Sequence, residues 1–320
     1  MKHAWLAALG LCSLANATAL PDGPPQWHPG AEQCTAETTR TEIREIDPLT
    51  YALRQNPCVD YEANLVYLLL GTQRALLIDT GAVDGAAGAP LVEWVRQVVE
   101  RVGEGKLSLL VVHSHGHQDH RAGDSAFSAL PNTEIAPHEG AALRQFLRFK
   151  DWPNDVAQID LGGRILDLIP APGHHQDHIV FYDRNLALLF TGDFLLPGRL
   201  LVDDLDAYHA SALRVADFVK QHPVGHVFGA HIELDASGDP YPGGATFHPD
   251  ERPLPLSPRE VLALPAALAD FNGFYSRHPN FIVVNPIHNL LALAAGVIVA
   301  LAFVVWLVRR LWMRRRALRG

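Results

Sequence analysis

Short apolar runs separated by turn-forming residues dominate the chain from about residue 41 to residue 230. The runs are five to nine residues long and rich in Val, Ile and Leu, which is typical of strands. They predict strands over 41–46, 63–71, 74–81, 107–112, 165–170, 179–183, 186–191 and 226–230. Apolar residues at helical spacing predict helices over 90–102, 139–148 and 207–222. Strands interleaved with helices favour a layered α/β domain.

The N-terminal segment MKHAWLAALGLCSLANATA has the pattern of a secretory signal. A lysine near its start precedes an apolar stretch, and the small residues A-T-A at 17–19 form a cleavage site. The apolar stretch is too short for a comfortable membrane span. We therefore expect a signal peptide over 1–19, followed by a Pro/Gly-rich extended lead-in over 20–40.

The C-terminal segment has a different pattern. NLLALAAGVIVALAFVVWLV, residues 289–308, carries no charge over about 20 residues, or roughly 30 Å of helix, which matches a bilayer core. The tail at 309–320 holds six arginines and no acidic residue. By the positive-inside rule, this basic tail is cytoplasmic, and the protein is a single-pass protein of the cytoplasmic (inner) membrane. The folded domain, 41–280, would then lie on the periplasmic, extracytoplasmic side, joined to the helix by a linker over 281–288.

The charge of the folded domain argues against nucleic acid as a partner. The whole chain has a formal net charge of −9, but Lys2 and the six tail arginines belong to the two ends. Without them, 19 basic residues face 35 acidic ones. Such a domain would be repelled by polyanions. After signal cleavage only Cys34 and Cys58 remain, either as a disulfide or as two thiols.

The stretch HSHGHQDH, which follows the strand predicted over 107–112, is the densest group of titratable residues. His115 and His117 are two residues apart, so in an extended segment their side chains point the same way and can bind one ion. Asp119 and His120 are adjacent and diverge as the chain turns, which suits a second ion beside the first.

Further metal-binding residue types follow three downstream strands. PAPGHH places His174 at a strand end, LLFTGD places Asp193 there, and VFGAH places His231 there. Each is preceded by a glycine within two residues, which permits close approach of the backbone to a site.

The motifs LLIDTG, HSHGHQDH, APGHHQDH, FTGD and GAH, in this order over 42–231, resemble those of the metallo-β-lactamase-fold hydrolases. The resemblance implies an α/β fold, a four-layer αβ/βα sandwich, to which this chain adds one C-terminal transmembrane helix. It also implies two zinc ions per chain, although iron or manganese could bind the same ligands.

Residue by residue, the resemblance implies seven metal ligands. His115, His117 and His174 would hold one ion, Asp119, His120 and His231 the other, and Asp193 would bridge both. Asp79 of LLIDTG would support the ligands without binding metal. Asp119 would also be catalytic, because a carboxylate there can orient the nucleophile and take its proton.

The implied reaction is hydrolysis of an ester, thioester, lactone or similar bond in a small-molecule substrate, by a hydroxide activated between the metals. β-Lactamases proper carry cysteine or serine at the position of Asp193, and a bridging aspartate resembles the glyoxalase II, lactonase and phosphodiesterase branches. β-Lactamase or phosphodiesterase activity therefore remains an alternative, as does a non-catalytic membrane-tethered binding or sensor module. Because all seven positions hold metal-binding residue types, catalysis is favoured over the binding module.

Other polar residues near the motifs leave alternatives open. His175 and His178 could contact substrate or donate a proton, or they could support the ligands. Tyr208 opens a helix where a general acid could lie. The Gly/Pro-rich stretch 235–253 could form a wall of the substrate site or an ordinary surface loop.

Overall fold

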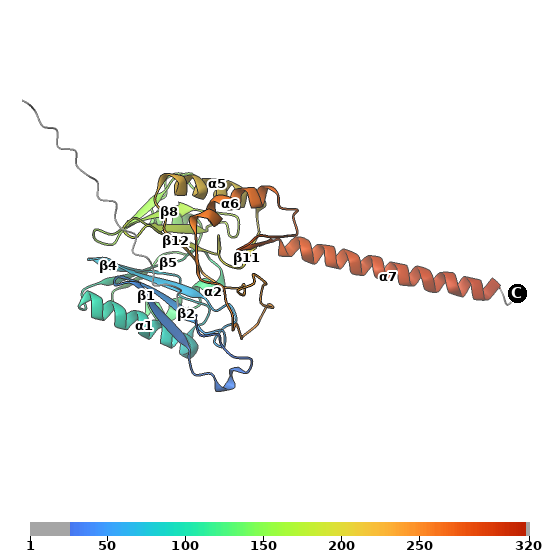
Figure 1. Ribbon diagram of the computed structural model, residues 1–320, viewed down its shortest axis with the longest axis horizontal. Coiled ribbons are helices and arrows are strands. Elements are labelled where there is room, and N and C mark those ends of the chain that lie inside the picture. Colours follow the sequence, from blue (N-terminus) through green and yellow to red (C-terminus); the bar gives the residue numbers. More distant parts are fainter. Residues whose placement is uncertain (1–25, 318–320) are drawn as a thin grey trace, which may run out of the picture.

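The computed structural model describes residues 26–317 of the 320-residue chain, with side chains through Arg314. The expected signal peptide, 1–19, lies outside the described residues. Two six-stranded mixed sheets face each other, and helices cover their outer surfaces (Figure 1). The predicted four-layer αβ/βα sandwich is confirmed.

The first sheet has the order β1-β2-β3-β4-β5-β6. Its strands are β1 (Thr41–Asp47), β2 (Thr50–Gln55), β3 (Leu65–Leu70), β4 (Arg74–Ile78), β5 (Ser108–Val112) and β6 (Thr133–Ile135). The second sheet has the order β13-β12-β10-β9-β8-β7. Its strands are β7 (Ala157–Asp160), β8 (Ile165–Pro170), β9 (Ile179–Asp183), β10 (Leu188–Gly192), β12 (His226–Gly229) and β13 (Pro255–Leu256).

A small third sheet, in the order β11-β15-β14, lies at the edge of the domain beside the C-terminal helix. Its strands are β11 (Arg199–Leu201), β14 (Tyr275–Arg277) and β15 (Ile282–Val284). The described helices are the 3-10 turn η1 (Cys34–Ala36), α1 (Gly85–Gly103), α2 (Gln118–Arg121), α3 (Asp124–Ser128), α4 (Gly140–Phe146), α5 (Leu205–Gln221), α6 (Pro258–Ala269) and α7 (Pro286–Ala317).

Three hydrophobic clusters hold the four layers together. The strand β3 contributes alternate side chains to two of them. Leu65 and Leu69 point into the cluster between the two sheets, whereas Val66 and Leu68 point into the cluster beneath α1. Because a strand alternates its side chains between faces, a strand buried on both faces must be apolar at every position. This is why ANLVYLLLG is an unbroken apolar run. The third cluster lies between the second sheet and helices α5 and α6.

Several element boundaries differ from the sequence-based expectation. Helix α1 begins at Gly85, five residues before the expected start, because its first residues are Gly and Ala and show no apolar periodicity. The strand β2 was not predicted, since TYALRQ ends in polar residues that are nevertheless buried. Helix α6 was not predicted either, because Pro265 interrupts its helical pattern.

Residues 281–288 were expected to form a linker, and the structure shows that they do not. These residues form β15 and the first turn of α7. The apolar run F-I-V-V forms a strand because Phe281 and Val283 are buried in the cluster beneath α5 and α6, while the backbone of β15 pairs with β11 and β14. The C-terminal helix therefore starts directly at the folded domain.

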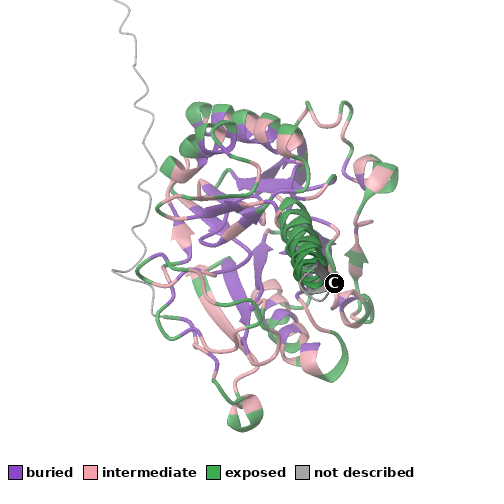
Figure 2. Ribbon diagram, turned by 90° about the vertical axis from the view of Figure 1, so that its right-hand side faces the viewer, coloured by how far each residue is buried: buried purple, intermediate pink, exposed green. Residues whose placement is uncertain are grey.

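Helix α7 is long and apolar enough to cross a membrane by length and composition. The candidate membrane span runs over Pro286–Arg314, and its most apolar part is not buried against the domain. Figure 1 shows the helix projecting away from the two sheets, and Figure 2 shows it almost wholly exposed.

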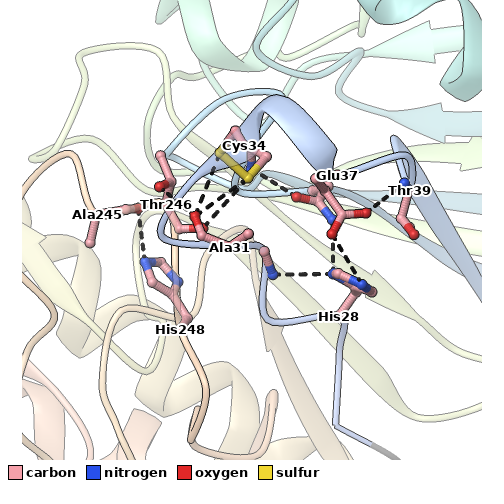
Figure 3. The surroundings of a disulfide bond; sticks show 11 residues. His28, Ala31, Cys34, Glu37, Thr39, Ala245, Thr246 and His248 are labelled. Atoms are coloured by element: carbon pink, nitrogen blue, oxygen red, sulfur yellow. Dashed lines mark hydrogen bonds and ion pairs between the residues drawn. A yellow bond between two sulfur atoms is a disulfide. The ribbon is translucent and has the colours of Figure 1, made fainter.

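The lead-in expected over 20–40 is not simply extended in its described part. Its residues from 34 to 36 form η1, and a disulfide joins Cys34 to Cys58 (Figure 3). The amide of Ala31 donates to the carbonyl of Thr246 at 3.0 Å, and the Thr246 hydroxyl donates back to the Ala31 carbonyl at 2.9 Å. These contacts attach the N-terminal segment to the stretch 235–253.

A buried ion pair connects the first sheet to that same stretch, and its loss should be costly. The Nη1 atom of Arg54 lies 2.6 Å from Oε2 of Glu251, and both side chains are at least nine-tenths buried. We expect Glu251→Ala to lower the free energy of unfolding by about 3–5 kcal/mol, because an unpaired guanidinium stays buried. The matched control Glu100→Ala removes an exposed partner of Arg96 and should cost at most about 1 kcal/mol. Equal midpoints of urea unfolding for the two variants would contradict this expectation.

Candidate metal centre

The seven predicted ligands all follow strand ends at one edge of the sandwich. His115 and His117 lie in the loop after β5, and Asp119 and His120 lie on the short helix α2. The other three follow strands of the second sheet: His174 follows β8, Asp193 follows β10 directly, and His231 follows β12. The structure thus brings side chains that are up to 116 residues apart in sequence to one place between the sheets.

The first group contains three imidazoles. Nε2 of His115 and Nδ1 of His117 are 2.8 Å apart. Nε2 of His174 lies 3.2 Å from Nε2 of His115 and 3.1 Å from Nδ1 of His117. Three ring nitrogens converging on one point is the arrangement expected of a facial set of metal ligands.

The second group contains two imidazoles and two carboxylates. Nε2 of His120 lies 3.1 Å from Oδ2 of Asp119 and 3.4 Å from Oδ1 of Asp193. Nε2 of His231 lies 3.3 Å from the same Asp193 oxygen. The other Asp193 oxygen, Oδ2, lies 3.5 Å from Nε2 of His174 in the first group. One carboxylate thus faces both groups, one oxygen to each.

The polar atoms at the centre fit divalent cations. Within each group the potential ligand atoms lie within 4.8 Å of one another. Nε2 of His120 and Oδ1 of Asp193 are buried and make no hydrogen bond. Burial would raise the pKa of the Asp193 carboxyl, but the positive charge of His231 and His120 holds it well below its usual value. An ionised carboxylate among buried imidazoles is a ligand set suited to zinc, iron or manganese.

Hydrogen bonds on the far side of three imidazoles set which ring nitrogen faces the centre. Nδ1 of His174 lies 3.0 Å from the carbonyl of Leu201, and Nδ1 of His231 lies 2.7 Å from the carbonyl of Glu62. Since a carbonyl only accepts, each Nδ1 carries a proton, and each Nε2 is the nitrogen that faces the centre and would bind a metal ion after releasing any proton of its own.

The carboxylate of Asp79 orients the ring of His120, as the two carbonyls orient His174 and His231. Its Oδ2 lies 2.9 Å from Nδ1 of His120 and accepts from the hydroxyl of Ser114 at 2.9 Å, while its Oδ1 accepts from the amide of Ser114 at 2.7 Å. Burial would raise the pKa of this carboxyl, but His120 and His113 outweigh burial and bring it to about 2. Asp79 is therefore a carboxylate that contacts a candidate ligand and stays outside the two groups, as the resemblance implies.

Two of the three residues for which the sequence left a substrate contact open are buried. His178 and Tyr208 are both fully buried, and the Tyr208 hydroxyl donates to the carbonyl of Phe194 at 2.6 Å. This burial favours a supporting role for both side chains over a contact with substrate. His175 is partly exposed, and its ring lies 5.1 Å from that of His117, between centroids.

A cavity of about 340 Å³ beside the centre contains residues that sequence reasoning missed. Its walls include Tyr61, Glu62, Arg199, Leu201 and Glu233. Two of these, Glu62 and Leu201, provide the carbonyls that orient His231 and His174. Residues 241–245 of the stretch 235–253 also line the cavity, so that part of the stretch is one of its walls. Only the Gly/Pro-rich character of that stretch gave a signal in the sequence.

Comparisons with known proteins identify relatives of the domain. A family model described as the metallo-beta-lactamase superfamily matches residues 60–231. The acyl-coenzyme A thioesterase MBLAC2 of Gallus gallus is 26% identical over 204 residues, which cover 53% of this chain and 72% of that protein. The hydroxyacylglutathione hydrolase of Chromohalobacter salexigens is 26% identical over 166 residues, which cover 50% of this chain and 60% of that protein.

Two further similarities concern a fungal enzyme and a solved structure. The atrochrysone carboxyl ACP thioesterase of Aspergillus chevalieri is 29% identical over 179 residues, and the match spans 52% of each protein. The metallo-beta-lactamase structure from Hirschia baltica has a TM-score of 0.50 at 17% identity, covering 72% of this chain and 98% of that one. At that identity the structural likeness concerns the fold alone.

Proposed function

We propose that this chain, which belongs to the metallo-beta-lactamase superfamily and is a metal-dependent hydrolase, holds two zinc ions. We propose further that it cleaves a thioester or a related ester. The observation that carries the proposal is the position of Asp193, with one oxygen toward each group of imidazoles. The names of the relatives favour the bond type, since two are thioesterases and a third is a hydroxyacylglutathione hydrolase.

In this proposal the ligand residues divide as the sequence suggests. His115, His117 and His174 hold one ion, Asp119, His120 and His231 hold the other, and Asp193 contacts both. When bound, the ions polarise the substrate carbonyl and lower the pKa of water. Hydrolysis adds water across the C–S or C–O bond and releases a carboxylic acid and a thiol or alcohol.

Asp119 is the residue placed to handle the proton of the attacking water. Its side chain is partly exposed, its Oδ2 accepts from the Asn64 amide at 3.3 Å, and the same oxygen lies 3.1 Å from Nε2 of His120. Burial would raise the pKa of its carboxyl, but His120 lowers it below the ordinary value, so the group is a carboxylate at neutral pH. A carboxylate here can accept a hydrogen bond from water and orient it.

We therefore expect Asp119→Asn to lose more activity than metal. The amide keeps an oxygen toward the second group but cannot take a proton, so kcat should fall by about 10²-fold or more. Metal content measured on the same preparation should fall by less than half. A variant that loses metal and turnover in the same proportion would show that Asp119 acts only as a ligand.

The proposed bond type is tested with a panel of substrates. The purified full chain, loaded with zinc, is offered thioesters, oxoesters, lactones, β-lactams and phosphodiesters. We expect a thioester or ester to be cleaved fastest and a chelator to abolish the reaction. Fastest cleavage of a β-lactam or phosphodiester, or turnover that survives removal of metal, would overturn the proposal.

We further propose that the domain is exported and anchored on the periplasmic side of the inner membrane. The support is the signal-like segment 1–19, the apolar helix α7 and the arginines from residue 309 onward. A reporter fused after Gly320 should be active only if it functions in the cytoplasm. An export-dependent reporter that is active at this position would contradict the orientation.

A further inference from the structure

The small sheet β11-β15-β14 carries an apolar row across its outer face. The register pairs Leu201 with Val284 and Val284 with Tyr275. Residues paired across strands point to the same face, about 4.8 Å apart from strand to strand. Leu200 and Val283 directly precede Leu201 and Val284 on their strands, so they point to the other face of the sheet. Both are fully buried in the cluster under α5 and α6, so that other face is the inner one. The row therefore lies on the opposite face, where Leu201 and Tyr275 are exposed and Val284 is partly exposed, although Ile282 on the same face is buried.

One end of the row reaches the metal centre. Leu201 lines the 340 Å³ cavity, and its carbonyl accepts from Nδ1 of His174 at 3.0 Å. Its side chain is 39% exposed, which leaves an apolar surface open at the cavity wall. A substrate lying along the row would thus arrive next to the first group of imidazoles.

The other end of the row reaches the base of α7. Tyr275 follows Phe274, whose carbonyl accepts from the Asn285 amide at 3.1 Å and from the Asn289 side chain at 3.0 Å. Nδ1 of His288 lies 2.9 Å from the carbonyl of Gly273. These hydrogen bonds hold the first turn of the helix against the segment 273–275, which carries Phe274 and the first residue of β14. The helix is therefore fixed to the domain at this point and does not hang from a flexible tether.

The residues around the helix base are unusually apolar for an exposed surface. Phe274 and Tyr275 are each 45% exposed and Ile287 is 54% exposed. If α7 spans a bilayer, its apolar segment begins at Leu290, one residue after the Asn289 side chain that binds the Phe274 carbonyl. Aromatic residues at that level lie at the membrane interface, where Tyr is enriched.

We propose that the row Leu201–Val284–Tyr275 is the path by which the acyl chain of a substrate resident in the bilayer enters the site. The substrate class is then an amphipathic acyl thioester or ester, whose apolar chain lies on the row and whose reactive carbonyl lies at the metal centre. This proposal rests on the proposed hydrolytic function, which it narrows. The domain itself supplies the contact with the bilayer through Phe274 and Tyr275.

The first test measures contact with the bilayer and does not depend on activity. In a Cys12→Ser background, the full chain carrying Tyr275→Cys is labelled with an environment-sensitive fluorophore and reconstituted in nanodiscs. We expect brominated lipids to quench this label, and to leave unquenched a label at Leu213→Cys, a residue of α5 that is 46% exposed. If Tyr275→Cys is poorly folded, Phe274→Cys replaces it. Equal quenching at 275 and 213 would overturn the proposal.

The second test separates the inference from the function on which it rests. Tyr275→Ser in nanodiscs is compared with Leu213→Ser on an acetyl and a palmitoyl thioester of the same thiol. We expect Tyr275→Ser to lower kcat/KM for the palmitoyl substrate about tenfold, through lost apolar contact, and to lower it much less for the acetyl substrate, whose chain is too short to lie along the row. Equal effects on both chain lengths would contradict the apolar path. Absence of hydrolysis of either substrate by the unmutated chain would contradict the proposed function, while the quenching result would still decide the bilayer contact.

Discussion

Asp193→Ala is expected to lose about one of two bound metal equivalents and to reduce hydrolysis by about 10²-fold or more. The reason is its position between the groups: Oδ2 lies 3.5 Å from Nε2 of His174, and Oδ1 lies 3.3 Å from Nε2 of His231. Two cations held a few ångströms apart repel each other, and a shared carboxylate offsets part of both charges while it sets their separation. Alanine removes that charge from both sites at once.

The measurement combines metal analysis with steady-state kinetics on one preparation. Asp206→Ala is the control, since it removes an exposed carboxylate in the first turn of α5 and should leave metal content and turnover unchanged. Thermal unfolding of both variants distinguishes loss of metal from loss of the fold. Full metal content with full turnover in Asp193→Ala would refute its bridging role.

Asp79→Asn is expected to weaken binding of one metal by about 10- to 100-fold while the fold is preserved. The carboxylate accepts from Ser114 through one oxygen and contacts Nδ1 of His120 through the other. If the asparagine oxygen keeps the Ser114 amide, the NH2 group turns toward His120. Nδ1 of His120 must then accept, which places the ring proton on Nε2 and removes the lone pair that would bind the metal.

A conservative control exists beside this residue. Asp124→Asn makes the same chemical change next to His113, whose Nε2 lies 3.1 Å from Oδ1 of Asp124 and which belongs to neither ligand group. Competition with a chromophoric chelator should show weakened affinity for Asp79→Asn alone. Identical affinities in the two variants would mean that the ring orientation of His120 does not depend on Asp79.

The positions of the ligands could be predicted because the signal is local. A strand followed by G-H, G-D or G-x-H places that side chain at a sheet edge, and His174, Asp193 and His231 are the three cases. The packing of the two sheets then brings the ends of β5, β8, β10 and β12 to one edge of the sandwich. The sequence left the roles of His178 and Tyr208 open, because whether either side chain is buried depends on packing from other elements, here on β10 and on the backbone of Phe194.

The cavity and the small sheet could not be predicted for a related reason. Arg199 and Leu201 meet the segment around residue 241 only through tertiary packing, and none of them belongs to a motif. The strand β15 was predicted as a linker because three residues are too few to show a period, and because its pairing with β11 joins it to a segment about 80 residues earlier in the sequence. Local pattern thus indicated the chemistry of the site, whereas its access depends on long-range contacts.

The central claim is that two cations share Asp193, and the most direct measurement is the metal content of the full chain purified in detergent and dialysed against metal-free buffer. The account predicts about two equivalents of zinc per chain, falling to about one in Asp193→Ala and remaining at two in Asp206→Ala. A content of one or fewer in the unmutated chain after reconstitution with zinc, or two in Asp193→Ala, would contradict it.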